Sequence, residues 1–268
     1  RSAIDFNNNN VIAFACGTTI NFCYVEDFTL KQGYSITLGR NNVSALKFHP
    51  TLPYVFIGDS KGFIYLYDYQ SRQLIAKPFL FNDNVDINQF GFFDDRLLVL
   101  YKNRLFALFV FQQAKEKSKF YNFQLLAKEQ LPEQTTNFCC DPYHKNRFFI
   151  YGKDTTFFML YSFDKAKVCF KPVTEQFFLP QNLSFKEAQF SLHLRDYVFF
   201  IAEQCVMLYN IEFNLISSIQ HYQKTSSFLQ SFVQFSSDHS KILCFHKSGT
   251  ITMYDVRDPF NLYAIAEI

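Results

Sequence analysis

Histidine, cysteine and carboxylate side chains can perform acid–base, nucleophilic or metal chemistry, but their spacing in this chain favours none of the three. No two histidines stand at the spacing of a helical metal site, and none lies beside a nucleophile motif. The closest approach to a metal motif is Cys139-Cys140 followed by His144, which lacks the paired Cys-x-x-Cys and His-x-x-x-His spacing of a tetrahedral zinc site. The histidines are His49, His144, His193, His221, His239 and His246. We therefore expect no catalytic residue and no metal site.

Paired carboxylates and phosphate-binding loops are not supported either. Asp94-Asp95 and Glu26-Asp27 are adjacent acids at the ends of expected strands, where such pairs mostly form turns and solvated tips. The motifs G-x-x-x-x-G-K-[ST] and G-x-G-x-x-G do not occur, and the chain has only 8 glycines. We expect no cofactor, no small-molecule substrate and no enzyme activity.

The cysteines indicate a reducing compartment. Their number is odd, and they are scattered among apolar neighbours in a chain too long to depend on disulfide bonds. They are Cys16, Cys23, Cys139, Cys140, Cys169, Cys205 and Cys244. Such residues are typical of buried free thiols, which predicts a cytoplasmic protein. Because the first residue is Arg1 rather than Met, we also expect the sequence to be part of a longer chain.

Charge identifies no partner. Lys+Arg number 26 and Asp+Glu 24, so the formal net charge of +2 gives no strong field for a nucleic-acid backbone or an anionic membrane. The basic run Lys115-Glu-Lys-Ser-Lys119 is typical of a solvated loop, because three lysines with an intervening acid make a poor nucleic-acid contact. No run of about eighteen apolar residues occurs, which argues against membrane insertion.

The amino-acid composition indicates the kind of source organism and predicts which motif residues are replaced. The chain has 36 Phe and 16 Tyr but 0 Trp. Packing alone does not explain this contrast, because Phe and Trp serve similar purposes in cores. A genome rich in A/T codons, such as that of a protist, explains it. A family motif that requires Trp can therefore carry Tyr or Phe here.

The elements that must position these residues are strands. Helical periodicity is almost absent, whereas short runs rich in Val, Ile, Phe and Tyr recur between turns of Asn, Asp, Gly, Ser and Pro. Residues 54–68 and 241–255 match in pattern without a gap from the tight turn onward. An aromatic residue marks the same place in six units at Tyr24, Tyr67, Phe109, Tyr161, Tyr209 and Tyr254, spaced by 43, 42, 52, 48 and 45 residues.

A period of about 40 to 50 residues with four strands per unit predicts an all-β propeller, in which each unit is one blade. The predicted blades are residues 1–40, 41–83, 84–131, 132–180, 181–222 and 223–268, within a single domain. Six blades are visible, and a seventh is possible in the intact protein.

The units resemble WD40 repeats. Phe48-His-Pro matches the turn that follows the first strand in that family, and Gly58-Asp-Ser-Lys-Gly-Phe-Ile matches its tight turn. Tyr67-Asp68 and Tyr254-Asp255 stand where the family has Trp-Asp, and Asp141-Pro142 keeps the first-strand turn in a third unit. The Gly-His that usually opens a blade is missing. We therefore expect the family's His-to-Asp hydrogen-bond network to be mostly lost and the blades to depend on aromatic packing.

Consecutive aromatic residues support blade stacking. Phe148-Phe149 and Phe199-Phe200 must face opposite ways in a strand, so both faces of those strands need cover. Neighbouring blades provide that cover. Phe177 to Pro180 falls in a connection between blades and is the one candidate anchor for a partner, although no individual contact residue is assigned.

The resemblance implies a non-catalytic scaffold for protein–protein interaction within a large assembly. The opening run from Val11 to Phe22 is similar to the first blade of cilia- and flagella-associated WD-repeat proteins, which implies a structural component of the cytoskeleton in the cilium or axoneme. Phe48-His-Pro-Thr-Leu-Pro53 with Leu66-Tyr-Asp-Tyr69 is similar instead to blades of coatomer-type vesicle coats, which implies a membrane-trafficking scaffold. A hydrolase using a central channel is the third class, but the expected innermost strands hold hardly an acid.

Overall fold

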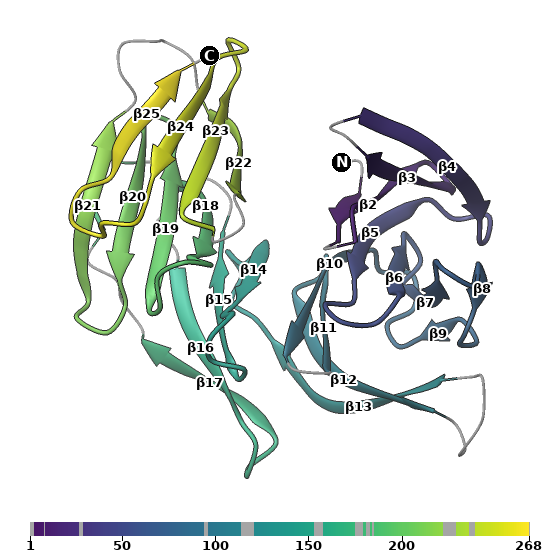
Figure 1. The fold of residues 1–268 in the computed structure, drawn as a ribbon. Helices are drawn as coiled ribbons and strands as arrows, with labels where there is room; N and C mark the ends of the chain where they lie inside the picture. Colours follow the sequence, from purple (N-terminus) through teal and green to yellow (C-terminus); the bar gives the residue numbers. More distant parts are fainter. Residues whose placement is uncertain are drawn as a thin grey trace. The chain divides into compact units, whose positions relative to one another are not determined.

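In the computed structural model the described residues form strands and turns. These residues are 3–7, 9–26, 29–93, 96–113, 121–152, 158–174, 179–180, 183, 185–221, 229–235 and 239–267. Over these ranges the strands group into six antiparallel sheets and no helix occurs (Figure 1). The all-β prediction is confirmed.

Each sheet is a meander of four strands that pair in chain order, and in blade 2 a fifth strand, β9, pairs with β7 (Figure 1). Blade 1 comprises β1 (Ile4–Phe6), β2 (Val11–Cys16), β3 (Thr19–Glu26) and β4 (Thr29–Thr37), and blade 2 comprises β5 (Val43–Phe48), β6 (Tyr54–Asp59), β7 (Phe63–Asp68), β8 (Gln73–Leu74) and β9 (Phe79–Leu80). Blade 3 comprises β10 (Ile87–Phe93), β11 (Arg96–Tyr101), β12 (Leu105–Gln113) and β13 (Tyr121–Gln130), and blade 4 comprises β14 (Asn137–Cys140), β15 (Arg147–Tyr151), β16 (Phe158–Asp164) and β17 (Cys169–Thr174). Blade 5 comprises β18 (Phe185–Phe190), β19 (Tyr197–Ala202), β20 (Cys205–Asn210) and β21 (Leu215–His221), and blade 6 comprises β22 (Leu229–Phe235), β23 (Lys241–His246), β24 (Ile251–Asp255) and β25 (Tyr263–Glu267).

Each sheet falls inside one of the six ranges expected from the repeat. By its internal contacts the chain divides into two compact units, Arg1–Glu133 with Asp164–Phe170 and Gln134–Phe163 with Lys171–Ile268. The single-domain interpretation stays a prediction.

Blade 2 departs from the four-stranded pattern, because its outer strand is divided. β8 and β9, two residues each, both pair with β7, at its end and at its start respectively. The intervening segment contains Pro78, which has no N–H to donate to a ladder. Ile75 instead accepts a backbone hydrogen bond of 2.8 Å from Tyr121 of β13, which links blade 2 to blade 3.

In blades 2 and 6 the tight turn after the second strand contains a glycine. Gly62 and Gly249 occupy matching positions in blades 2 and 6, with φ of 90° and 91°. Only glycine adopts this conformation without strain. The match confirms that the two segments aligned from the sequence form the same turn.

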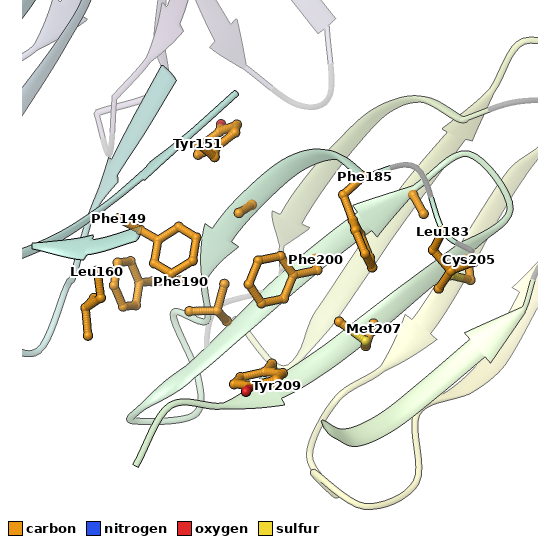
Figure 2. Packing of buried hydrophobic residues seen from close by; sticks show 13 residues of the cluster. Phe149, Tyr151, Leu160, Leu183, Phe185, Phe190, Phe200, Cys205, Met207 and Tyr209 are labelled. Carbon is orange, nitrogen blue, oxygen red and sulfur yellow. The ribbon is translucent and has the colours of Figure 1, made fainter. Parts of the chain in front are cut away.

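Aromatic packing between blades forms the core, as expected. Phe199 and Phe200 are both fully buried, but Phe199 packs with blade 6 and Phe200 with blade 4. Figure 2 shows the second of these cores, where the Phe200 ring centroid lies 5.5 Å from that of Phe149 and 5.7 Å from those of Phe185 and Tyr209. Neighbouring aromatic residues in one strand therefore serve two different interfaces.

The hydrogen-bond network at the tight turn is altered rather than lost in blade 2. The buried Asp59 accepts hydrogen bonds from the backbone N–H of Lys61 and Phe63, both at 2.9 Å, from Asn41 Nδ2 at 2.9 Å and from Tyr65 Oη at 3.1 Å. Burial, and then the Asp59 charge, raise the pKa of Tyr65 to about 12, so its hydroxyl stays a donor at neutral pH. In blade 6 the matching pair is His246 and Thr252, with His246 Nε2 3.1 Å from Thr252 Oγ1.

Candidate functional site

The turns between the first and second strands share one mode of construction. In blade 2 His49 Nδ1 accepts from the backbone N–H of Thr51 and Leu52 at 3.2 and 3.0 Å. In blade 5 Ser191 Oγ accepts in the same way from the two residues at the equivalent places. A buried acceptor therefore fixes each turn by satisfying backbone donors that strand pairing leaves unused.

Asp141 holds the equivalent turn of blade 4. Its Oδ1 accepts from the backbone N–H of Tyr143 at 2.8 Å and of His144 at 3.1 Å. Its Oδ2 accepts from Arg147 Nε at 2.5 Å, and its side chain is completely buried. One carboxylate therefore both shapes the turn and binds a guanidinium.

Arg147 joins this turn to blade 5. Its Nη2 lies 2.5 Å from Asp196 Oδ1, and both side chains are largely buried. Asp196 has a φ of 63°, a left-handed conformation that Asp tolerates better than most residues. The charge-assisted bonds from Arg147 to two carboxylates hold the turns of neighbouring blades together.

His144 lies between two arginines. Its Nδ1 is 3.0 Å from Asp141 Oδ2 and 2.7 Å from Arg147 Nη2, and its Nε2 is 3.1 Å from Arg195 Nη2. Because guanidinium groups only donate, Nε2 accepts from Arg195, and Nδ1 either accepts from Arg147 or donates a proton to Asp141, depending on the tautomer. The ring is held on both sides.

Two large side chains of the same two turns are exposed to solvent. Tyr143 and Leu192 are each 40% exposed, and Tyr143 Oη donates to the Leu192 carbonyl at 2.8 Å. The Leu192 N–H donates in turn to Gln234 Oε1 of blade 6 at 2.7 Å. We call this surface the 4–5 turn cluster, comprising Asp141, Tyr143, His144, Arg147, Leu192, Arg195 and Asp196.

The 4–5 turn cluster is suited to binding rather than catalysis. Its two arginines and two aspartates cancel, so it attracts no strongly charged ligand. Tyr and Arg are the residue types that most often dominate the energy of protein interfaces. Because the buried bonds fix the turns, binding a partner costs little ordering entropy here.

The structure does not bring the six histidines together. His49 and His246 are buried in separate blades, His144 belongs to the 4–5 turn cluster, His193 is half-buried in its turn, and His221 and His239 are exposed. Cys139 lies on β14, and burial raises the pKa of its thiol well above the ordinary value. In the described ranges no three His, Cys, Asp or Glu residues gather as a metal site would require.

All seven cysteines are free, but only three are buried as expected. Cys23, Cys205 and Cys244 are buried, Cys139, Cys140 and Cys169 are half-buried, and Cys16 is exposed. Cys16 ends β2 on its half-covered face, where the alternation of the strand places it toward solvent.

Several predicted features lie wholly or partly outside the described residues. They are Asp94-Asp95, Asp27 of the other acidic pair, the run from Lys115 to Lys119, and Phe177 and Phe178 of the candidate anchor. Leu179 and Pro180, which complete that anchor, are half-buried, and Leu179 packs against the core between blades 4 and 5. Among the described residues there is no helix that could cross a membrane.

The sequence singled out two residues of the 4–5 turn cluster, Asp141 and His144, and missed the other five. Asp141-Pro142 was visible as a first-strand turn. Arg147 and Asp196 stand 49 residues apart, and only the stacking of two sheets brings them together. The exposed Tyr143 and Leu192 give no pattern of their own.

Comparison with known proteins identifies the fold. No protein-family model matches the chain, and no curated protein matches it. A chain from a crystal structure of the mitotic checkpoint complex matches over 99% of this chain and 78% of its own length, with a TM-score of 0.73 at 12% identity. A Lactobacillus plantarum protein solved by a structural genomics consortium matches over 99% of this chain and 83% of its own length, with a TM-score of 0.73 at 9% identity. At these identities the likeness shows the fold alone, and with the six meander sheets it establishes a WD40-like β-propeller fold.

Proposed function

We propose that this chain is a non-catalytic scaffold that binds a partner protein through the 4–5 turn cluster. The observation that carries the proposal is the pair of exposed side chains, Tyr143 and Leu192, whose residues are joined by a hydrogen bond and lie in the two turns that the Asp141–Arg147–Asp196 ion pairs connect. Preorganised aromatic and aliphatic residues beside arginine are typical of the centre of a protein interface.

The fold is consistent with this role. One structural neighbour is a component of the mitotic checkpoint complex, which is an assembly of several proteins. The first strands of the blades contain two carboxylates, Asp5 and Glu187. Asp5 accepts from Lys47 Nζ at 3.0 Å and from the Phe48 N–H at 2.7 Å, and Glu187 lies within hydrogen-bond distance of Gln189. That composition favours a binding surface over acid–base chemistry.

A cytoplasmic assembly of the cilium or axoneme is the narrower proposal, and a vesicle coat or tether is the alternative. Both come from the resemblance of short segments near Val11 and Phe48 to blades of those two protein groups. They predict different partners, so one purification distinguishes them.

The test is affinity purification of the tagged full-length protein from its own source, with ciliary and membrane extracts prepared separately and analysed by mass spectrometry. Axonemal proteins support the first assignment, and coat or tethering subunits support the second. The double variant Tyr143→Ala/Leu192→Ala should recover about tenfold less of the main partner, or less still.

The matched control is Leu52→Ala. Leu52 is also 40% exposed and lies in the equivalent turn of blade 2, where the turn acceptor is His49 in place of the ion-paired Asp141. Equal recovery of partners by wild type and by the double variant would remove the 4–5 turn cluster from the proposal. If Leu52→Ala also loses partners, binding depends on exposed residues of these turns in general and is not specific to the 4–5 turn cluster.

A further inference from the structure

The charged side chains of the 4–5 turn cluster lie at different depths. The side chain of Asp141 is completely buried, and those of Asp196 and Arg147 are 18% and 17% exposed. Arg195 differs from them, because 68% of its side chain is exposed. The two carboxylates therefore lie beneath the surface while one guanidinium faces solvent. The cluster is neutral as a whole, but the charge that it presents at contact is positive.

Arg195 is held in place and keeps donors to spare. Its Nη2 lies 3.1 Å from His144 Nε2, and its Nε lies 3.4 Å from Asp196 Oδ2. A guanidinium has five N–H donors, and these two contacts use one hydrogen of Nη2 and the hydrogen of Nε. Within the described part of the chain no acceptor bonds Nη1. The edge formed by Nη1 and Nη2 can therefore bind a carboxylate through two parallel hydrogen bonds.

Two hydrogen bonds between the same two turns place Arg195 near the exposed Tyr143 and Leu192. Tyr143 Oη donates to the Leu192 carbonyl at 2.8 Å, and His144 Nε2 contacts Arg195. Tyr143 and His144 are consecutive residues, whose Cα atoms are about 3.8 Å apart. The phenol, the leucine and the guanidinium therefore belong to one small area of the surface.

The remaining exposed charge of the two turns has the same sign as Arg195. Residues 141–147 and 191–196 contain three cations, Lys145, Arg147 and Arg195, and two carboxylates, Asp141 and Asp196, so three minus two gives a formal net charge of +1. Lys145 and Arg195 are exposed, whereas neither carboxylate is. A carboxylate that approaches Arg195 is therefore attracted and meets no exposed acid of these two turns.

The other turns of this kind do not all have this chemistry. The equivalent turn of blade 2, residues 49–53, also exposes a leucine but contains no Lys, Arg, Asp or Glu. An apolar contact alone would suit either turn. The exposed guanidinium is what distinguishes the 4–5 turn cluster.

From this arrangement we propose that the partner of the 4–5 turn cluster presents an Asp or Glu carboxylate to Arg195, beside an apolar side chain that packs on Tyr143 and Leu192. The inference rests on the proposed scaffold function and names the chemistry of its partner. Arg147 takes no part in this contact, because two carboxylates of the chain itself already bind it. One exposed guanidinium edge matches one carboxylate.

The test is selection of a phage-displayed library of short random peptides on the purified chain, followed by removal of every peptide that also binds Tyr143→Ala/Leu192→Ala. The peptides that remain depend on the 4–5 turn cluster. We expect Asp or Glu, together with an apolar residue, to be enriched in them over the unselected library. The same selection on Arg195→Glu should enrich Lys or Arg in place of the acid.

The contact itself is measured with the most strongly selected peptide, labelled with fluorescein for anisotropy. Replacing its acid by the corresponding amide should weaken binding to the wild-type chain about fivefold, or about 1 kcal/mol, the upper end for an exposed ion pair. The same replacement should change binding to Arg195→Gln by less than about twofold. This double-mutant cycle isolates the pair between Arg195 and the peptide acid, which a merely structural role of Arg195 would not produce.

Arg257→Gln is the matched control. The Arg257 side chain is 63% exposed, and its substitution removes one positive charge, as Arg195→Gln does. Arg257 binds Asp255 in blade 6, with Nε 3.0 Å from both carboxylate oxygens, and is not part of the 4–5 turn cluster. This variant should bind the peptide as the wild type does. Thermal unfolding of each variant checks that it folds.

The outcomes distinguish this inference from the proposed function. Peptides that depend on the cluster but carry no enriched acid would overturn the carboxylate contact, and so would an amide replacement that costs the same in wild type and Arg195→Gln. Equal weakening by Arg257→Gln would also overturn it, because net charge would then explain the attraction. In these cases the cluster stays a binding surface. If no selected peptide depends on Tyr143 and Leu192, the proposed binding surface fails, and this inference fails with it.

Discussion

At the scale of single residues, the turn glycines show that one position of the repeat can have different packing in different blades. Gly62 and Gly249 have the same backbone conformation, but a Cβ at Gly62 would lie 2.2 Å from the carbonyl oxygen of Asn82, whereas nothing lies within 4 Å of one at Gly249. The backbone conformation of the turn is therefore the same in blades 2 and 6, but the atoms packed around it are different.

This difference predicts unequal costs of the same substitution. Gly249→Ala should lower the free energy of unfolding by about 1 to 2 kcal/mol, the strain of a left-handed alanine. Gly62→Ala should cost roughly 1 to 3 kcal/mol more, because the backbone of the next connection must also move. Urea unfolding of both variants measures this, and equal midpoints would show that the Asn82 contact relaxes freely.

At the scale of elements, the first-to-second-strand turns of blades 2, 4 and 5 are each fixed by one buried hydrogen-bond acceptor that belongs to the turn itself. His49, Asp141 and Ser191 each accept two backbone N–H groups. Of these three acceptors Asp141 is also ion-paired, with Arg147, so the turn of blade 4 depends on one carboxylate for both interactions.

Asp141→Ala should therefore destabilise the protein by about 3 kcal/mol, since it leaves two backbone donors without their acceptor and removes one of two partners of Arg147. Asp141→Asn keeps the turn acceptor and loses only the charge, so it should cost about half as much. Thermal unfolding distinguishes the two. If Asp141→Asn lowers the free energy of unfolding as much as Asp141→Ala does, the stabilisation comes from the ion pair with Arg147 and not from the turn hydrogen bonds.

At the scale of the whole molecule, blades depend on their neighbours. Phe199, Ile201, Val206 and Leu208 of blade 5 are fully buried against Ile242, Cys244 and Tyr254 of blade 6. In repeat proteins each unit buries its faces only against the next, so removal of one uncovers the other.

Deleting residues 223–268 should therefore unfold or aggregate what remains, because four large apolar side chains of blade 5 become exposed. Circular dichroism and sedimentation of the shortened chain test this. Co-expression of residues 223–268 as a separate fragment is the control and should restore the fold. A monomeric shortened chain with an undiminished melting transition would contradict the repeat interpretation.

The fold was predictable from sequence to the level of the blade. Strand periodicity and the aromatic markers such as Tyr67 and Tyr254 depend on local pattern, and both residues are buried on third strands as the repeat requires. The divided outer strand of blade 2 was not predicted, because Pro78 acts there together with the contact between Ile75 and Tyr121 of another blade.

The binding surface was not predictable in the same way. Whether Leu192 is a core residue or a surface residue depends on what packs against its turn, and strand pattern carries no such information. The same limit applies to Arg147, whose contact with Asp196 exists only because two sheets stack.

The turn acceptors of blades 2, 4 and 5 have a consequence for the history of such a chain. An imidazole, a carboxylate and a hydroxyl perform the same task, so what selection must preserve is a lone pair at one point in space. A turn of this kind can pass through many residue types by single substitutions without losing its shape. Over long divergence the residue types at these positions can change while the turn that they stabilise keeps its conformation.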